Sequence, residues 1–114
     1  MQRALRVVIA ASVLMSSLAW PAEELLGPDK WPTSVTETVR DIVQRMAEKD
    51  KEIVRTTKKE DLIKFHHGWG TGIRNHYGLW RGNDKLTLSA CGKPCHPDEA
   101  SMVIIEAVWQ ALQK

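Results

Sequence analysis

The chain has 114 residues and a mass of 12.9 kDa, with 43% hydrophobic and 26% charged residues, which allows one ordinary globular domain at most. This composition excludes a disordered tail, a collagen-like repeat and a multi-domain enzyme. The formal net charge is +2, but removing Arg3 and Arg6 with a leader leaves 14 of the 16 basic residues, which balance 14 acidic ones. Such a balance argues against nucleic-acid binding, which requires a basic excess.

Residues 1–19 are typical of a secretory signal peptide. Two arginines precede the apolar run 7–15, which is too short to cross a bilayer comfortably. Small residues up to Ala19 predict cleavage before Trp20, while cleavage after Ala22 and an uncleaved membrane anchor are the alternatives. We therefore expect an exported protein, periplasmic or secreted, with no stable membrane anchor after cleavage.

The first predicted helix follows a segment rich in proline. Residues 20–32 are expected to form an extended lead-in because proline and glycine recur there. Ser34 and Glu37 then form a capping box, and apolar residues recur at steps of three and four as far as Met46. This pattern predicts a helix of about four turns that ends in the charged run 48–52.

A second capping box, Thr57 with Glu60, predicts another helix, whose apolar positions continue as far as Trp80. Three glycines interrupt this stripe, and each weakens an isolated helix by up to ~1 kcal/mol relative to alanine. They are Gly68, Gly70 and Gly72. We expect them to permit close approach of another backbone or to mark a deliberate break in the helix.

The last third of the chain predicts two further helices. Asn83 is a candidate cap for a short helix, and Pro97 suits the first turn of a final one. Asp98 and Glu99 in that first turn are favourable to the helix dipole. No convincing strand alternation occurs, so the sequence predicts an all-α fold, a small bundle of about four helices spanning residues 33–114.

The two cysteines are separated by Gly92, Lys93 and Pro94, which favour a turn. In an exported protein we expect Cys91 and Cys95 to form a disulfide that staples a loop. Cys91, Cys95 and His96 also resemble a lengthened haem-attachment motif and the cysteine pair of copper-delivery proteins. Copper, zinc or haem at these three residues is therefore the alternative, and the main interpretation needs no cofactor.

Two stretches carry a resemblance to a known family. Residues 66–80 read HHGWGTGIRNHYGLW, and residues 96–102 read HPDEASM. They resemble a bacterial domain family of unassigned function, marked by a histidine with paired glycines, Ile-Arg-Asn, Gly-Leu-Trp, and a His-Pro-Asp-Asp-Met-Ser start of the final helix. Here Glu99 replaces the second aspartate and the Met-Ser order differs. The resemblance covers roughly residues 31–112 and implies only an established compact domain, because the family supplies no reaction, cofactor or catalytic residue to carry over to this chain.

Four polar residues of the first stretch would share one helix face if residues 61–77 stayed helical. They are His67, Thr71, Arg74 and Asn75. Together they could bind a carboxylate or phosphate through the guanidinium fork of Arg74. The favoured interpretation is structural: Arg74 pairs with Asp98 or Glu99, and Asn75 satisfies a backbone end.

The chain contains five tryptophans but only one tyrosine and one phenylalanine. Trp69, Trp80 and Trp109 lie on the apolar stripes and are expected in the core. Trp20 and Trp31 lie in the lead-in, where local packing is favoured over an exposed contact with a partner.

No nucleophile and base stand at a recognisable spacing, so we expect non-catalytic binding or inhibition of another macromolecule, most readily a protein. An immunity-type inhibitor fits the size and compartment by analogy. The alternative is a periplasmic metal or haem carrier using Cys91, Cys95 and His96. A small hydrolase with His66 or His67 as general base is a third candidate. A metal site made by the histidines alone is not expected, because adjacent histidines on a regular helix diverge by about 100° and cannot chelate one ion.

Overall fold

The computed structural model describes residues 25–114, so the expected signal peptide 1–19 and Trp20 lie outside the described residues. Every regular element in the described part is a helix, which confirms the all-α prediction. In chain order the elements are η2 (Pro28–Lys30), α2 (Val35–Arg45), α3 (Glu48–Arg55), η3 (Lys59–Phe65), α4 (Trp69–His76), α5 (Asp84–Cys91) and α6 (Pro97–Ala111), where η denotes a 3-10 helix. None of these helices is long and apolar enough to cross a membrane.

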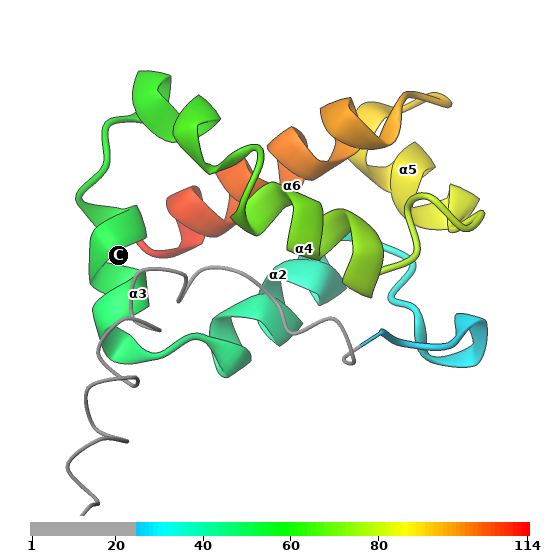
Figure 1. Cartoon of the computed structure of the whole chain (residues 1–114), viewed down its shortest axis with the longest axis horizontal. Coiled ribbons are helices and arrows are strands. Elements are labelled where there is room, and N and C mark those ends of the chain that lie inside the picture. The colour runs from blue at the N-terminus through cyan, green and yellow to red at the C-terminus, as the bar shows by residue number, and fades with distance from the viewer. Residues whose placement is uncertain (1–24) are drawn as a thin grey trace, which may run out of the picture.

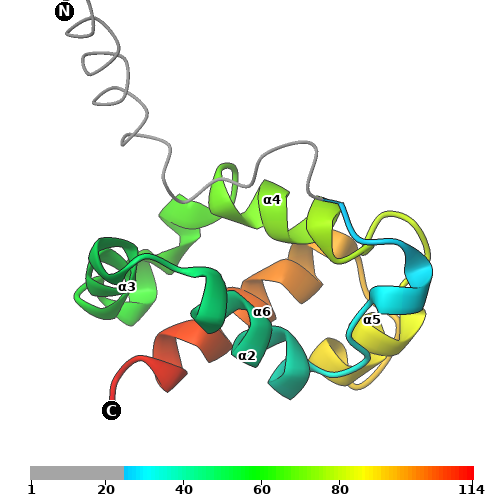
Figure 2. The same cartoon turned by 90° about the horizontal axis from the view of Figure 1, so that it is seen from below.

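Helix α6 is the centre of the packing. It contacts α2, α4, α5 and η3, and Figure 2 shows it lying between α4 and α2. Ala100, Ile104, Ile105 and Val108 of α6 are fully buried. In Figure 1 the start of α6 lies beside α5, and its far end lies toward α3. The final helix is therefore buried on several sides, as its broad apolar face predicts.

Helix α2 begins where the capping box predicts. The Ser34 hydroxyl accepts a hydrogen bond from the Glu37 amide at 3.1 Å, and the Glu37 carboxylate accepts one from the Thr33 amide at 2.9 Å. The predicted continuation into residues 48–52 is wrong, because the backbone is extended at Met46 and α3 begins anew at Glu48. This break lets α3 turn Val54 into the core, where that side chain is fully buried.

The expected long helix from Thr57 to Trp80 is also wrong. The Thr57 hydroxyl donates to the Ile53 carbonyl at 2.7 Å and so completes the end of α3 instead of capping a new helix. Residues Lys59–Phe65 form the 3-10 helix η3, and α4 starts separately after Gly68. One of the interrupting glycines therefore marks a break in the helix.

The apolar stripe predicts the burial of Trp80 wrongly. Trp69 is 3% exposed, as expected, whereas Trp80 is 54% exposed. Helix α4 ends at His76, and Gly78 adopts a φ of 73°, which redirects the chain before the stripe reaches Trp80. Leu79, at 6% exposure, takes the buried position instead.

Trp31 packs locally, as the sequence favours. Its indole Nε1 donates to the Leu26 carbonyl at 3.1 Å, and its ring lies against Gly78. A Cβ atom at Gly78 would lie 2.2 Å from the Trp31 ring, so this position requires glycine for space as well as for its positive φ. The segment around η2 is thereby fixed against the turn that follows α4.

The Asn83 cap is confirmed. Its side-chain oxygen accepts from the Leu86 amide at 3.3 Å, and its amide group donates to the Tyr77 carbonyl at 2.8 Å and the Pro32 carbonyl at 3.1 Å. One buried side chain therefore starts α5 and ties it to two other segments. Pro97 occupies the first turn of α6, which is also confirmed.

Candidate functional site

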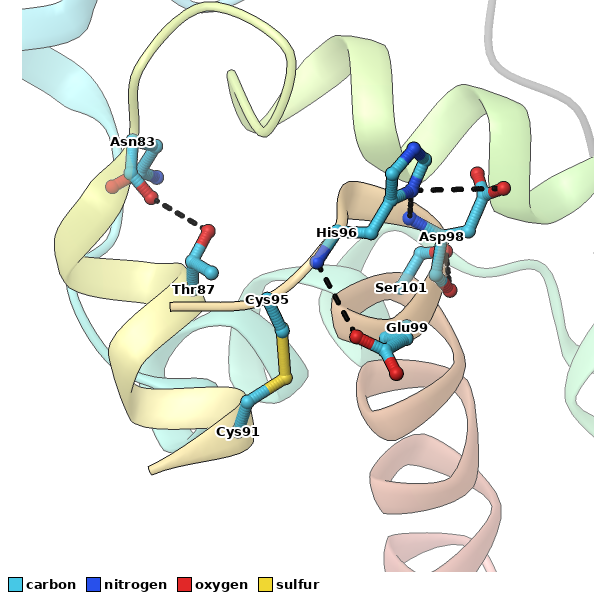
Figure 3. Close-up of a disulfide and its surroundings, with 8 residues drawn as sticks. All are labelled: Asn83, Thr87, Cys91, Cys95, His96, Asp98, Glu99 and Ser101. Atoms are coloured by element: carbon cyan, nitrogen blue, oxygen red, sulfur yellow. Dashed lines mark hydrogen bonds and ion pairs between the residues drawn. A yellow bond between two sulfur atoms is a disulfide. The ribbon is translucent and has the colours of Figure 1, made fainter. Parts of the chain in front are cut away.

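The predicted disulfide is present. The Cys91 and Cys95 sulfur atoms lie 2.01 Å apart and join the end of α5 to the residue that precedes His96, the N-cap of α6 (Figure 3). Among the described residues no cysteine is free. Both sulfur atoms are therefore engaged with each other in this state.

His96 caps helix α6, which the sequence analysis did not find. Its Nδ1 accepts a hydrogen bond from the Asp98 amide at 3.0 Å, and the Glu99 carboxylate accepts one from the His96 amide at 3.3 Å (Figure 3). This is a capping box in which histidine replaces the usual serine or threonine. The sequence contains a signal for this cap, because Glu99 lies three residues after His96 and the His96 side chain can accept a hydrogen bond. Because Nδ1 accepts, the neutral ring carries its proton on Nε2.

Asp98 is the point at which the two motif stretches meet. Its Oδ1 lies 3.5 Å from Arg74 Nε, and its Oδ2 lies 3.9 Å from His66 Nε2 and 3.7 Å from His96 Nδ1. The Asp98 side chain is 47% exposed. One half-exposed carboxylate thus faces three nitrogen-bearing side chains that the fold gathers from α4, the segment before it and the start of α6.

Arg74 is buried and engaged by protein groups. It is 5% exposed, and its guanidinium donates to the Ser101 hydroxyl at 2.9 Å, the Thr71 hydroxyl at 3.0 Å and the His66 carbonyl at 3.2 Å. A Cβ atom at Gly70 would lie 3.0 Å from Arg74 Nη1, so the glycine leaves the space that the guanidinium fills. These contacts join α4 to α6 through Arg74.

The other three residues of the predicted ligand-binding set are placed differently. The Thr71 hydroxyl contacts Arg74 and also donates to the His67 carbonyl. The His67 side chain is exposed, and its ring lies edge-on to that of His66, with 4.9 Å between centroids. Asn75 is exposed on α4, and its backbone carbonyl accepts a hydrogen bond from Arg81 at 2.9 Å.

Trp80 and His96 form an exposed pair beside this cluster. Their rings meet edge to face at 90°, with 5.3 Å between centroids, and the His96 side chain is 56% exposed. We define Trp80, His96 and Asp98 as the Trp80–His96 surface. It offers a large indole, an imidazole with an available Nε2–H donor, and a carboxylate, which are features of a binding surface. Its principal residue, Trp80, is the one that the apolar stripe predicts in the core and that the structure exposes.

A groove lies on another part of the molecule, between Trp31 and helix α2. Its volume is about 440 Å³, and Asp41 and Arg45 line it. The Asp41 carboxylate accepts a hydrogen bond of 2.6 Å from the Tyr77 hydroxyl. Burial raises the pKa of Tyr77 far above its ordinary value, and the bond to Asp41 raises the pKa further.

In the part of the chain described here, no cluster of three or more histidine, cysteine or acidic residues could hold a metal ion.

The fold and its surface define a small, disulfide-bonded, all-helical domain. The chain belongs to the family described as "Domain of unknown function (DUF6794)", whose model matches residues 31–112. The match confirms the resemblance at the level of a domain of unknown function, and it contains the whole Trp80–His96 surface. No curated protein and no solved structure gives a significant match.

Proposed function

We propose that this protein is an exported, non-catalytic binding module that captures another protein through the Trp80–His96 surface. The observation that carries the proposal is the exposure of Trp80, which leaves 54% of the residue in solvent while Trp69 is 3% exposed. Tryptophan is enriched among the residues that dominate protein–protein binding energy. Export is supported by the signal-peptide pattern of residues 1–19 and by the disulfide, which suits an oxidising compartment.

The turn that carries Trp80 is held by short-range hydrogen bonds. The amides of Arg81 and Asn83 both donate to the Gly78 carbonyl, at 2.9 Å and 3.0 Å. The Leu79 amide donates to the Arg74 carbonyl at 3.0 Å, which fixes the residue just before Trp80. A preorganised aromatic side chain loses less conformational entropy on binding, which favours affinity.

The His96 side of the surface is fixed as well. The capping box holds its backbone and ring, and the disulfide of Cys95 restrains the residue before it. The bond between Arg74 and Ser101 and the ion pair between Arg74 and Asp98 hold the first turn of α6 against α4. These contacts support a rigid surface composed of side chains from two segments.

The carrier alternative has less support. Cys91 and Cys95 are bonded to each other, and the Nδ1 atom of His96 accepts from the Asp98 amide. These residues do not fit a copper, zinc or haem site in this state, because the disulfide occupies both sulfur atoms and leaves neither a thiolate for a metal nor a thiol for haem attachment. A hydrolase is also less supported, since the Ser101 hydroxyl beside the cluster is buried and bonded to Arg74 and the Asp98 carbonyl.

Site-specific photo-crosslinking in the producing cell tests the proposal. A photoreactive phenylalanine replaces Trp80 in one variant and Ile63, which is 62% exposed on η3, in a matched control. We expect a discrete protein adduct at position 80 and none at position 63. Excess wild-type protein should compete the adduct away, and excess Trp80→Ala protein should not. Equal labelling at both positions, or no adduct at position 80, would overturn the proposal.

A further inference from the structure

We infer that His96 makes the Trp80–His96 surface sensitive to pH, because protonation of its Nδ1 atom exchanges one hydrogen-bond partner for another. In the neutral ring Nδ1 accepts from the Asp98 amide, and in the charged ring it donates to the Asp98 carboxylate. The exchange moves the imidazole relative to Trp80. The role of this movement in partner capture rests on the proposed function, whereas the movement itself does not.

The geometry around Nδ1 supports this exchange. The Asp98 amide nitrogen lies 3.0 Å from Nδ1, and the Asp98 Oδ2 atom lies 3.7 Å from it. The amide is a donor and requires a lone pair on Nδ1, whereas the carboxylate is an acceptor and requires a proton there. One nitrogen cannot serve both groups, so the protonation state decides which bond forms. Histidine is the side chain whose charge ordinarily changes between about pH 5 and 8.

The charged groups around His96 favour the carboxylate as the new partner. Arg74 Nε faces Asp98 Oδ1 at 3.5 Å, which leaves Oδ2 toward the imidazoles. His66 Nε2 lies 3.9 Å from the same Oδ2 and competes with His96 for it. Glu99 lies on the other side, where its carboxylate accepts from the His96 amide at 3.3 Å. The positive N-terminal end of α6 disfavours a charged imidazole, so these carboxylates supply the attraction.

The expected change is local. Helix α6 keeps the bond between Glu99 and the His96 amide, and the disulfide still holds Cys95. The ring of His96 pivots away from the Asp98 amide, and its edge-to-face contact with Trp80 changes with it. Trp80 therefore reports the state of His96 without any partner present.

Nuclear magnetic resonance of the isolated protein tests the inference. At pH 8 the ¹⁵N shifts of His96 should show the neutral tautomer with its proton on Nε2. Between pH 8 and pH 5 the indole N–H resonance of Trp80, assigned with a Trp80→Phe variant, should move along one titration curve. His96→Asn should remove this movement, because asparagine still caps a helix but does not titrate in this range. His67→Asn, which removes an exposed neighbouring histidine, should leave the movement intact.

Three results would overturn the inference. They are a neutral His96 with its proton on Nδ1, a Trp80 resonance that titrates equally in His96→Asn, and a His96 that titrates while Trp80 stays unchanged. Because the isolated protein is used, these results are independent of the crosslinking outcome. A switch without an adduct at position 80 would contradict the proposed function alone, and an adduct without a switch would contradict this inference alone.

Discussion

Arg74 of α4 and Asp98 of α6 lie 3.5 Å apart, from Nε to Oδ1, and join the two sequence stretches that carry the family resemblance. The Ser101 hydroxyl, one helical turn beyond Asp98, accepts a second bond from the same guanidinium at 2.9 Å. Two contacts to residues one turn apart on the same face of α6 fix the angle at which this helix starts. The half-exposed Asp98 is therefore held by a buried arginine, Arg74.

Replacing Arg74 with alanine should destabilise the protein. The change leaves the Ser101 and Thr71 hydroxyls without their guanidinium partner and opens a cavity between α4 and α6. We expect a loss of about 2–3 kcal/mol in the free energy of unfolding, discounted for the partial exposure of Asp98. Urea denaturation measures it. Arg40→Ala, at an exposed position of α2, is the control and should change stability by less than about 0.5 kcal/mol. Equal stability of the two variants would show that Arg74 does not hold the helices together.

Gly70→Ala should be destabilising even though alanine favours helix formation. The new Cβ atom would lie 3.0 Å from Arg74 Nη1 and 3.2 Å from the Phe65 carbonyl oxygen, and the latter cannot move without shifting the backbone. We expect a net loss of about 1–3 kcal/mol. Gly68→Ala is the matched control, since nothing lies within 4 Å of its Cβ position, and it should change stability by less than about 1 kcal/mol. A Gly70→Ala protein as stable as the control would contradict the close approach of Arg74.

Local signals predict the parts of this fold that local interactions determine. The Ser34 cap, the Asn83 cap and the disulfide each depend on residues a few positions apart, so sequence spacing is sufficient to find them. The exposure of Trp80 depends on Gly78, whose φ of 73° and contact with Trp31 bring together distant segments. Periodicity alone cannot show that a helix stops four residues earlier.

In the candidate site, too, some features can be predicted from the sequence and others cannot. Asp98, the observed partner of Arg74, is one of the two acidic residues that charge complementarity predicts for it. The cap formed by His96 was missed because histidine is not a common helix cap, although Glu99 stands at the right spacing. The surface as a whole could not be predicted, since it requires knowing where α4 ends relative to the start of α6.

Replacing both cysteines with serine should have a modest effect. The disulfide closes a loop with a sequence separation of four, so it restrains little of the unfolded chain. We expect a loss at the low end of the usual ~2–4 kcal/mol, measured by thermal or urea unfolding. The photo-crosslink at position 80 should persist in this double variant at a temperature where it stays folded. Loss of the adduct in a folded double variant would mean that the disulfide is essential to the surface.

Tyr77 should resist ionisation in the folded protein. Burial, followed by the hydrogen bond to Asp41, raises its pKa well above the ordinary 10.0. The folded state holds this proton more tightly than the unfolded state. The contribution of Tyr77 to the free energy of unfolding is therefore fully present below about pH 10, and above that pH it falls by about 1.4 kcal/mol per pH unit. Ultraviolet titration of the chain's single tyrosine measures this directly.

Tyr77→Phe supplies the control for that titration. It removes the ionisable hydroxyl, so its stability should depend less steeply on pH above pH 10 than that of the wild-type protein. Tyrosinate absorbance that appears near pH 10 in the folded wild-type protein would contradict the buried bond between Tyr77 and Asp41.

The central claim, an exported binding module with no resident metal or haem, is tested most directly by the intact mass of the protein recovered from the exported fraction. The mass is measured under native conditions and again after denaturation. We predict a denatured chain that begins at Trp20 and is two hydrogens lighter than its reduced form, with no covalent adduct, and a native species that carries at most a protein partner. A metal retained in the native spectrum, or a haem adduct that survives denaturation, would contradict the claim and assign the function to Cys91, Cys95 and His96.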